Sequence, residues 1–168
     1  GLLGRNGAGK TTLLNLMTNR IFPTEGEILI DGETVFENDR VLSNIFYMTE
    51  QNLYPEDERV RNIYKWIKEF YPSFDMEYAK DLSERFGLDT KKRVKNLSTG
   101  YASIFKAIAA LASNADIVLF DEPVLGLDAN HRDMFYKELI SNYSERSKTI
   151  IISTHLIEEV APVIEEAI

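Results

Sequence analysis

The chain has 168 residues, a formal net charge of -8 and no cysteine. Its length fits one domain with a buried core, and the lack of cysteine excludes disulfides and thiolate metal sites. The 27 acidic residues against 19 basic ones argue against broad, charge-driven contact with nucleic acid. No apolar run approaches the roughly 20 residues of a membrane span, and the start does not read as a signal peptide. These features are compatible with the cytoplasm and predict no nucleic-acid partner.

A glycine-rich stretch at residues 4–12 gives the strongest local signal. It reads GRNGAGKTT and fits G-x-x-x-x-G-K-[ST], the phosphate-binding loop of P-loop NTPases. Its glycines let backbone N–H groups turn toward phosphate oxygens, and the helix expected over 10–17 points its positive end at the same anion. Lys10 would reach the β- and γ-phosphates, and the Thr11 hydroxyl would bind Mg²⁺. The residues predicted to bind the nucleotide here are Asn6, Gly7, Gly9, Lys10, Thr11 and Thr12.

The next stretches predict a small antiparallel hairpin and then a buried strand. Residues 27–30 read as a strand, Asp31-Gly32 is a strong hairpin signal, and residues 33–36 form the return. The apolar run at 45–48 is bounded by polar residues, which predicts a buried strand.

Helical spacing dominates the middle of the chain. Apolar residues recur at three- and four-residue steps over 60–71 and again over 75–86, and a third helix opens within 96–101. Aromatic residues in the first helix are read as core rather than as a base-stacking surface. The basic run at 91–95 is read as a solvated face rather than a nucleic-acid site.

Two apolar strands in the last third end in polar residues that could do chemistry. The run at 117–120 leads into Asp121-Glu122, and the run at 149–153 leads to His155. An amphipathic helix is expected between the strands and a short helix after them.

This order of elements predicts an α/β fold, the parallel sheet of a P-loop NTPase with helices on both faces. A small antiparallel hairpin and a helical subdomain are inserted into it. We expect a single domain over 1–168, with its core in 1–54 and 110–168 and the helical subdomain at about 55–109. Ligands bind beyond the carboxyl ends of parallel strands, so the polar residues at these ends are expected to converge on one site.

Three residues are candidates for catalysis. Lys10 contacts the phosphates, Glu122 could orient or deprotonate an attacking water, and His155 could hydrogen-bond the γ-phosphate. Asp121 stands at the end of an apolar strand, where it would hold Mg²⁺ through the hydration shell of the ion. His131 is expected on the exposed side of a helix start, with no comparable role.

Five segments in this order resemble the ATP-binding subunit of an ABC transporter, of the bacterial exporter type. They are residues 4–11 (Walker A), 97–101 (signature), 119–123 (Walker B), 125–128 (D-loop) and 153–155 (H-loop). The resemblance implies ATP and Mg²⁺ as cofactors and hydrolysis that drives transport. It implies a head-to-tail homodimer or pseudo-dimer and a transmembrane permease subunit as partner. The protein would lie peripherally on the inner face of the cell membrane, in the cytoplasm.

The resemblance also implies roles across the dimer. Ser98 and Gly100 would touch the γ-phosphate bound to the other subunit, and Asp128 would communicate across the interface. Thr99 and Tyr101 replace the third and fifth residues of the usual Leu-Ser-Gly-Gly-Gln signature.

The glutamine of the family's Q-loop has no direct counterpart. Three residues past Tyr47, Glu50 stands where glutamine is usual, and Gln51 follows. Our hypothesis is that Glu50 approaches the metal. The partner's coupling helix is expected to dock around residues 53–55, by the same resemblance.

The family places an adenine-stacking aromatic residue and the first part of the sheet upstream of the phosphate loop, and further strands downstream. The chain lacks these parts, so we expect a fragment truncated at both ends that binds ATP weakly by itself.

Three other functions compete with transport. A soluble ABC-type ATPase acting on ribosomes or DNA is disfavoured by the acidic charge, and the stretch from Lys10 to Gly100 is too short for the long coiled coil of DNA-associated members. A kinase would not explain residues 97–101. A non-hydrolysing binding module would not need Glu122 and His155.

Overall fold

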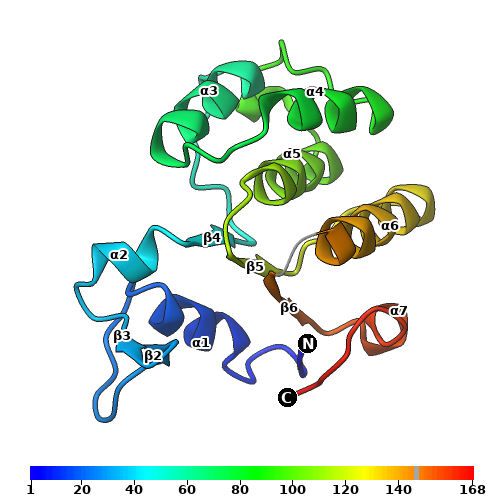
Figure 1. Ribbon diagram of the computed structural model, residues 1–168. Helices are drawn as coiled ribbons and strands as arrows, with labels where there is room; N and C mark the ends of the chain where they lie inside the picture. Colours follow the sequence, from blue (N-terminus) through cyan, green and yellow to red (C-terminus); the bar gives the residue numbers. More distant parts are fainter. Residues whose placement is uncertain (146–147) are drawn as a thin grey trace.

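The computed structural model describes residues 1–145 and 148–168 and shows an α/β fold around a parallel sheet (Figure 1). Four strands lie in the order β1-β6-β5-β4, and each neighbouring pair is parallel. The predicted fold class is confirmed. The strands are β1 (Leu2–Leu3), β4 (Ile45–Met48), β5 (Ile117–Asp121) and β6 (Thr149–Thr154).

Helices cover both faces of this sheet because the side chains of the buried strands alternate. Phe120 faces the core beneath α5 (Thr99–Ala112), whereas Leu119 packs with Leu14 of α1 (Lys10–Met17) on the opposite face. Helix α6 (Ala129–Glu145) connects β5 to β6, and α7 (Ile157–Val160) follows β6. No helix in the described part of the chain is long and apolar enough to cross a bilayer.

A layer of helices stands above α5 in Figure 1. It contains α3 (Val60–Phe70) and α4 (Met76–Arg85), which pack on α5 through buried aromatic side chains such as Tyr64 and Phe105. The Asp75 carboxylate caps α4 by accepting from the Tyr78 N–H at 2.9 Å. Two helices therefore form where the periodicity placed them. The division into a core and a helical subdomain stays a prediction.

The hairpin forms apart from the main sheet, with strands shorter than expected. Strands β2 (Leu29–Ile30) and β3 (Glu33–Thr34) are antiparallel and have two residues each. Asp31 and Gly32 between them both have positive φ, as a tight hairpin turn requires. A short helix that the sequence analysis did not predict, α2 (Asp39–Leu42), follows the hairpin.

Candidate functional site

The carboxyl ends of the parallel strands surround a cavity of about 330 Å³, which we call the nucleotide cavity. Each of the four strands is followed or ended by residues that line it, because parallel strands present their carboxyl ends at one edge. The structure thus brings together the phosphate loop, the two carboxylates and the histidine. The lining residues are Asn6, Gly7, Ala8, Gly9, Lys10, Thr11, Thr12, Glu50, Asp121, Glu122, Leu125 and His155.

The phosphate loop leaves open space where an anion can sit. Gly7 and Gly9 have φ of 83° and 92°, and apart from their own chain neighbours no residue has an atom within 4 Å of where a Cβ would stand. The Lys10 Nζ donates to the carbonyl oxygens of Gly4 at 2.7 Å and Arg5 at 3.3 Å. Helix α1 begins at Lys10 and adds its N-terminal dipole. These features fit the phosphates of a nucleotide.

The Asp121 carboxylate is only 1% exposed and is held by three hydroxyl donors. Its Oδ2 accepts from Thr11 Oγ1 at 2.8 Å and from the Tyr47 hydroxyl at 3.3 Å. Its Oδ1 accepts from Ser153 Oγ at 2.9 Å. Buried charges need such partners, so Asp121 is fixed in orientation. The sequence analysis did not predict Tyr47 as part of this set.

The Glu122 carboxylate is tied to the end of β6. Its Oε2 accepts from Thr154 Oγ1 at 3.1 Å, and its Oε1 accepts from the His155 backbone N–H at 3.1 Å. The same Oε1 lies 2.8 Å from His155 Nδ1 and 3.9 Å from Lys10 Nζ. Nε2 of His155 has no hydrogen-bond partner among the described residues, so Glu122 orients an imidazole that has one nitrogen free in the cavity wall.

The oxygen donors around the cavity suit a hard metal ion. The described residues contain no group of three or more His, Cys, Asp or Glu side chains placed to cage a metal. Thr11, Asp121 and Glu50 line the cavity instead. Such a set fits Mg²⁺, which proteins hold with one or two carboxylates together with phosphate oxygens and water. Gln51 is not among the lining residues, which favours Glu50 as the residue that faces a metal.

Three predicted site residues lie outside the cavity: Ser98, Gly100 and Asp128. Ser98 is exposed and caps α5, with its Oγ accepting from the Tyr101 N–H at 3.3 Å. Asp128 is exposed and accepts from the His131 backbone N–H at 2.9 Å. Hydrogen bonds from His131, the backbone one first, lower the pKa of the Asp128 carboxyl. Because Ser98 and Asp128 are exposed, another molecule could contact them.

Packing within the chain itself explains why residue 100 is glycine. A Cβ at this position would stand 2.7 Å from the Gly126 carbonyl oxygen, so only glycine fits without movement. Ser103 Oγ, one turn further along α5, donates to the Leu125 carbonyl oxygen at 2.8 Å. The start of α5 is therefore bound to the loop between β5 and α6.

His131 is not on an exposed face, so that expectation is wrong. Its side chain is 22% exposed and its ring stacks on Phe86 at a centroid distance of 6.0 Å. Tyr101 meets its edge at 6.2 Å. Aromatic neighbours from α5 and the end of α4 cover the imidazole, which the pattern of one helix could not reveal.

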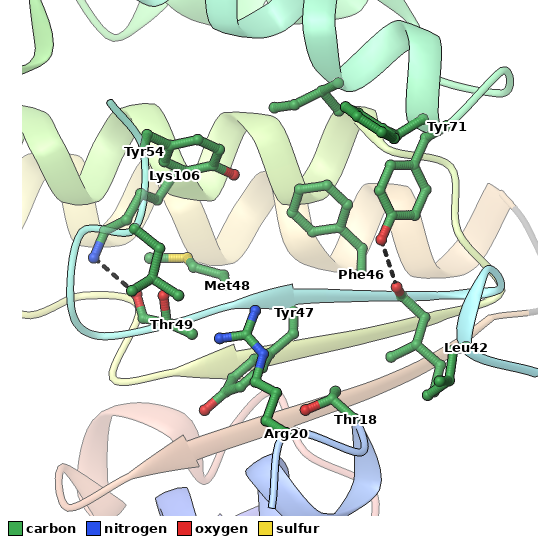
Figure 2. A pocket seen from close by; sticks show the side chains of 14 residues that line it. Thr18, Arg20, Leu42, Phe46, Tyr47, Met48, Thr49, Tyr54, Tyr71 and Lys106 are labelled. Carbon is green, nitrogen blue, oxygen red and sulfur yellow. Dashed lines mark hydrogen bonds between the residues drawn. The ribbon is translucent and has the colours of Figure 1, made fainter. Parts of the chain in front are cut away.

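A second cavity of about 340 Å³ lies along the edge strand β4, and we call it the groove (Figure 2). Its walls come from residues just after α1, from the end of α2, from β4 and the residues after it, and from α3 and α5. The lining residues are Thr18, Arg20, Leu42, Ile45, Phe46, Tyr47, Met48, Thr49, Leu53, Tyr54, Ile67, Phe70, Tyr71 and Lys106.

Polar side chains fix the walls of the groove. The Tyr71 hydroxyl donates to the Ile45 carbonyl oxygen at 2.8 Å. The buried Lys106 ammonium donates to the Thr49 carbonyl oxygen at 2.8 Å (Figure 2). It also donates to the Glu50 carbonyl oxygen. Burial lowers the pKa of Lys106. The sequence analysis missed Lys106, because nothing local marks a lysine inside an alanine-rich helix as a contact of a distant loop.

Comparisons with known proteins show the family of the chain. A sequence model of the family described as ABC transporter matches residues 1–125. The ABC transporter ATP-binding protein YtrB of Bacillus subtilis (strain 168) is 34% identical over 160 residues, covering 95% of this chain and 55% of YtrB. The ABC transporter ATP-binding protein NatA of the same organism is 34% identical over 176 residues, covering 100% of this chain and 71% of NatA.

Solved structures show the same fold. A structure of an ATP-binding subunit of an ABC transporter has a TM-score of 0.88 at 21% identity, covering 99% of this chain and 72% of that chain. At this identity the likeness concerns the fold alone. The chain spans about half the length of YtrB.

Proposed function

The chain belongs to the ABC transporter family, and we propose that it binds ATP with Mg²⁺ and hydrolyses it to drive transport by a partner membrane subunit. One observation carries this proposal. The phosphate loop, the Asp121-Glu122 pair and His155 line the same cavity although they lie far apart in the chain. The names of YtrB and NatA state no direction of transport, and the proposal states none.

Several residues of the cavity have a role in this proposal. Lys10 and the backbone of the phosphate loop bind the phosphates. Thr11, Asp121 and Glu50 hold Mg²⁺, which neutralises developing charge on the phosphate oxygens. Glu122 orients or deprotonates the attacking water.

His155 has its Nδ1 beside Glu122 and a second nitrogen without a partner among the described residues. Because Glu122 fixes the ring, that nitrogen is available to bond the γ-phosphate.

A second copy of the chain would complete the nucleotide cavity in our proposal. Ser98 and Gly100 stand at the N-terminus of α5, a position that favours an anion. Neither lines the cavity of its own chain, and Ser98 and Asp128 are exposed. We infer a head-to-tail homodimer or pseudo-dimer in which these residues meet ATP bound to the other copy. Hydrolysis then loosens the dimer, since contacts to the γ-phosphate differ between the two states.

The groove is the proposed docking site of the membrane subunit, at the inner face of the cell membrane. Leu53 is 57% exposed and lines it together with Tyr54. Pro55, the third residue expected there, is not among the lining residues. Lys106 joins the groove to the backbone of Glu50, so the surface that would receive the partner is next to a proposed metal ligand.

The proposal is tested by ATP hydrolysis in vesicles that contain the protein with its membrane subunit. Glu122→Gln should bind ATP but lose hydrolysis by roughly 100-fold or more, the usual contribution of a general base. Glu84→Gln, an exposed site on α4, should behave as wild type. Co-purification with ribosomes or nucleic acid in place of a membrane protein would contradict the transport role and favour a soluble ATPase.

A further inference from the structure

Tyr47 on β4 belongs to the groove and also reaches the nucleotide cavity. Its ring lines the groove beside Arg20 (Figure 2). Its hydroxyl donates to Asp121 Oδ2 at 3.3 Å, and Asp121 lines the nucleotide cavity. The Tyr47 side chain thus connects the groove with a residue that lines the nucleotide cavity.

The register of the sheet explains this reach. Tyr47 pairs with Leu119 on β5, and Asp121 lies two residues further along the same strand. Side chains two residues apart share a face of the sheet, so Tyr47 and Asp121 project to the same side. An aromatic side chain can reach a diagonal neighbour of this kind. Phe46 and Met48 project to the opposite face and join the core beneath α5.

The hydroxyl is a dependable donor. A tyrosine phenol has an ordinary pKa of about 10, so its hydroxyl carries a proton to donate at neutral pH. The ring is held from the groove side by the Arg20 guanidinium, whose carbon lies 4.8 Å from the ring centroid. Both ends of the side chain are therefore fixed.

Asp121 has few donors to hold it once a metal is bound. Thr11 donates to the same oxygen as Tyr47, and Thr11 is itself a proposed metal ligand. Tyr47 on Oδ2 and Ser153 on Oδ1 are the two hydroxyls that remain for the carboxylate. Partners of this kind orient the groups that hold a metal.

We propose that Tyr47 is a positioning residue for Asp121, and that its hydroxyl holds the carboxylate in the orientation that binds Mg²⁺. This role rests on the proposed function. Tyr47 is not among the residues that line the nucleotide cavity, so it would act through Asp121.

The test compares two tyrosines of the groove. Tyr47→Phe and Tyr71→Phe each remove one hydroxyl and keep the ring, but Tyr71 bonds the Ile45 carbonyl and no carboxylate. The affinity for Mn²⁺ in the presence of ATP is measured by electron paramagnetic resonance on the full-length protein. ATP affinity is measured with Mg²⁺ and with EDTA. Tyr47→Phe should bind Mn²⁺ about 10-fold more weakly, with unchanged ATP affinity in EDTA, and Tyr71→Phe should match wild type.

Two results would overturn the role of Tyr47 alone: wild-type Mn²⁺ affinity in Tyr47→Phe, or an equal loss in both variants, which would indicate general disturbance of the groove. Melting temperatures of both variants separate such disturbance from a local effect. If the wild-type protein binds no ATP in either condition, the proposed function is wrong and the role of Tyr47 falls with it.

Discussion

The nucleotide cavity and the groove have similar volumes, about 330 and 340 Å³, but they are built in different ways. Most of the nucleotide cavity comes from residues 4–12 and from residues at strand ends. The groove is assembled from residues just after α1 and from α2, β4, α3 and α5, and it depends on contacts such as Lys106 to Thr49. Most residues of the nucleotide cavity therefore belong to short motifs that can be recognised in the sequence, whereas the residues of the groove come from scattered positions that form no motif.

Lys10→Met should damage the nucleotide cavity and spare the groove. It removes a charged donor to the phosphates, and hydrogen bonds to charged groups contribute about 1.5–3 kcal/mol. ATP affinity, measured by calorimetry, should fall roughly 10- to 100-fold, while binding of the membrane subunit without nucleotide should not change. Lys137→Met, at an exposed pair with Asp133, is the control. Equal losses of both kinds of binding would show that the two regions are not independent.

Leu53→Asp should weaken binding at the groove and leave the nucleotide cavity intact. A charge at this exposed apolar position of the groove opposes burial against a partner, and the lost apolar contact alone is worth about 1.5–3 kcal/mol when complete. Because Leu53 is about half exposed, we expect roughly 10-fold weaker binding of the membrane subunit, with ATP affinity unchanged. Leu29→Asp serves as the control, since Leu29 is 51% exposed on the hairpin outside the groove. Wild-type transport by Leu53→Asp would refute this docking surface.

Lys106→Met should affect both regions, because Lys106 lines the groove and bonds the backbone of Glu50. The substitution leaves two carbonyl oxygens without their donor, at a cost of about 1–3 kcal/mol. The free energy of unfolding should fall by that amount, and the melting temperature by roughly 2–4 °C per kcal/mol. Lys65→Met on the exposed side of α3 should leave both quantities at the wild-type value.

The same lysine gives a smaller effect of pH with a definite sign. Burial lowers the pKa of Lys106 below 10.5 in the folded protein. Between the lowered pKa and 10.5 the unfolded chain binds more protons at this site, so folding stability gained from Lys106 rises with pH. The difference in unfolding free energy between wild type and Lys106→Met should therefore increase through this alkaline window. Denaturant unfolding at several pH values measures it, and a constant or falling difference would contradict the assignment.

The sequence predicted the parallel sheet and most of the nucleotide cavity because the information is local. The glycines of the phosphate loop set their own backbone, and apolar strands end directly in Asp121 and before His155. The sequence does not tell whether Glu50 or Gln51 faces the metal, because side chains of adjacent residues point in different directions that only the fold determines. The structure places Glu50 in the cavity wall, and its contact with a metal stays a prediction.

Features that depend on register or on distant helices were beyond the sequence analysis. Tyr47 meets Asp121 only through the pairing of β4 with β5, and His131 is covered by residues of other helices. Helix α2 is different, because a local signal existed. The Asn38 side chain accepts from the Val41 N–H at 3.3 Å as an N-cap, and this pattern was overlooked.

Gly100 and Gly126 bring the first turn of α5 against the loop before α6. The Gly126 carbonyl oxygen lies only 2.7 Å from where a Cβ on Gly100 would stand, and the Ser103 hydroxyl donates to the Leu125 carbonyl oxygen of the same loop. Ser98 lies two residues before Gly100 in the sequence, and Asp128 lies two residues after Gly126. In the proposed dimer, a displacement of one of these residues would therefore be passed to the other through this contact, which would couple their two contacts with the second copy.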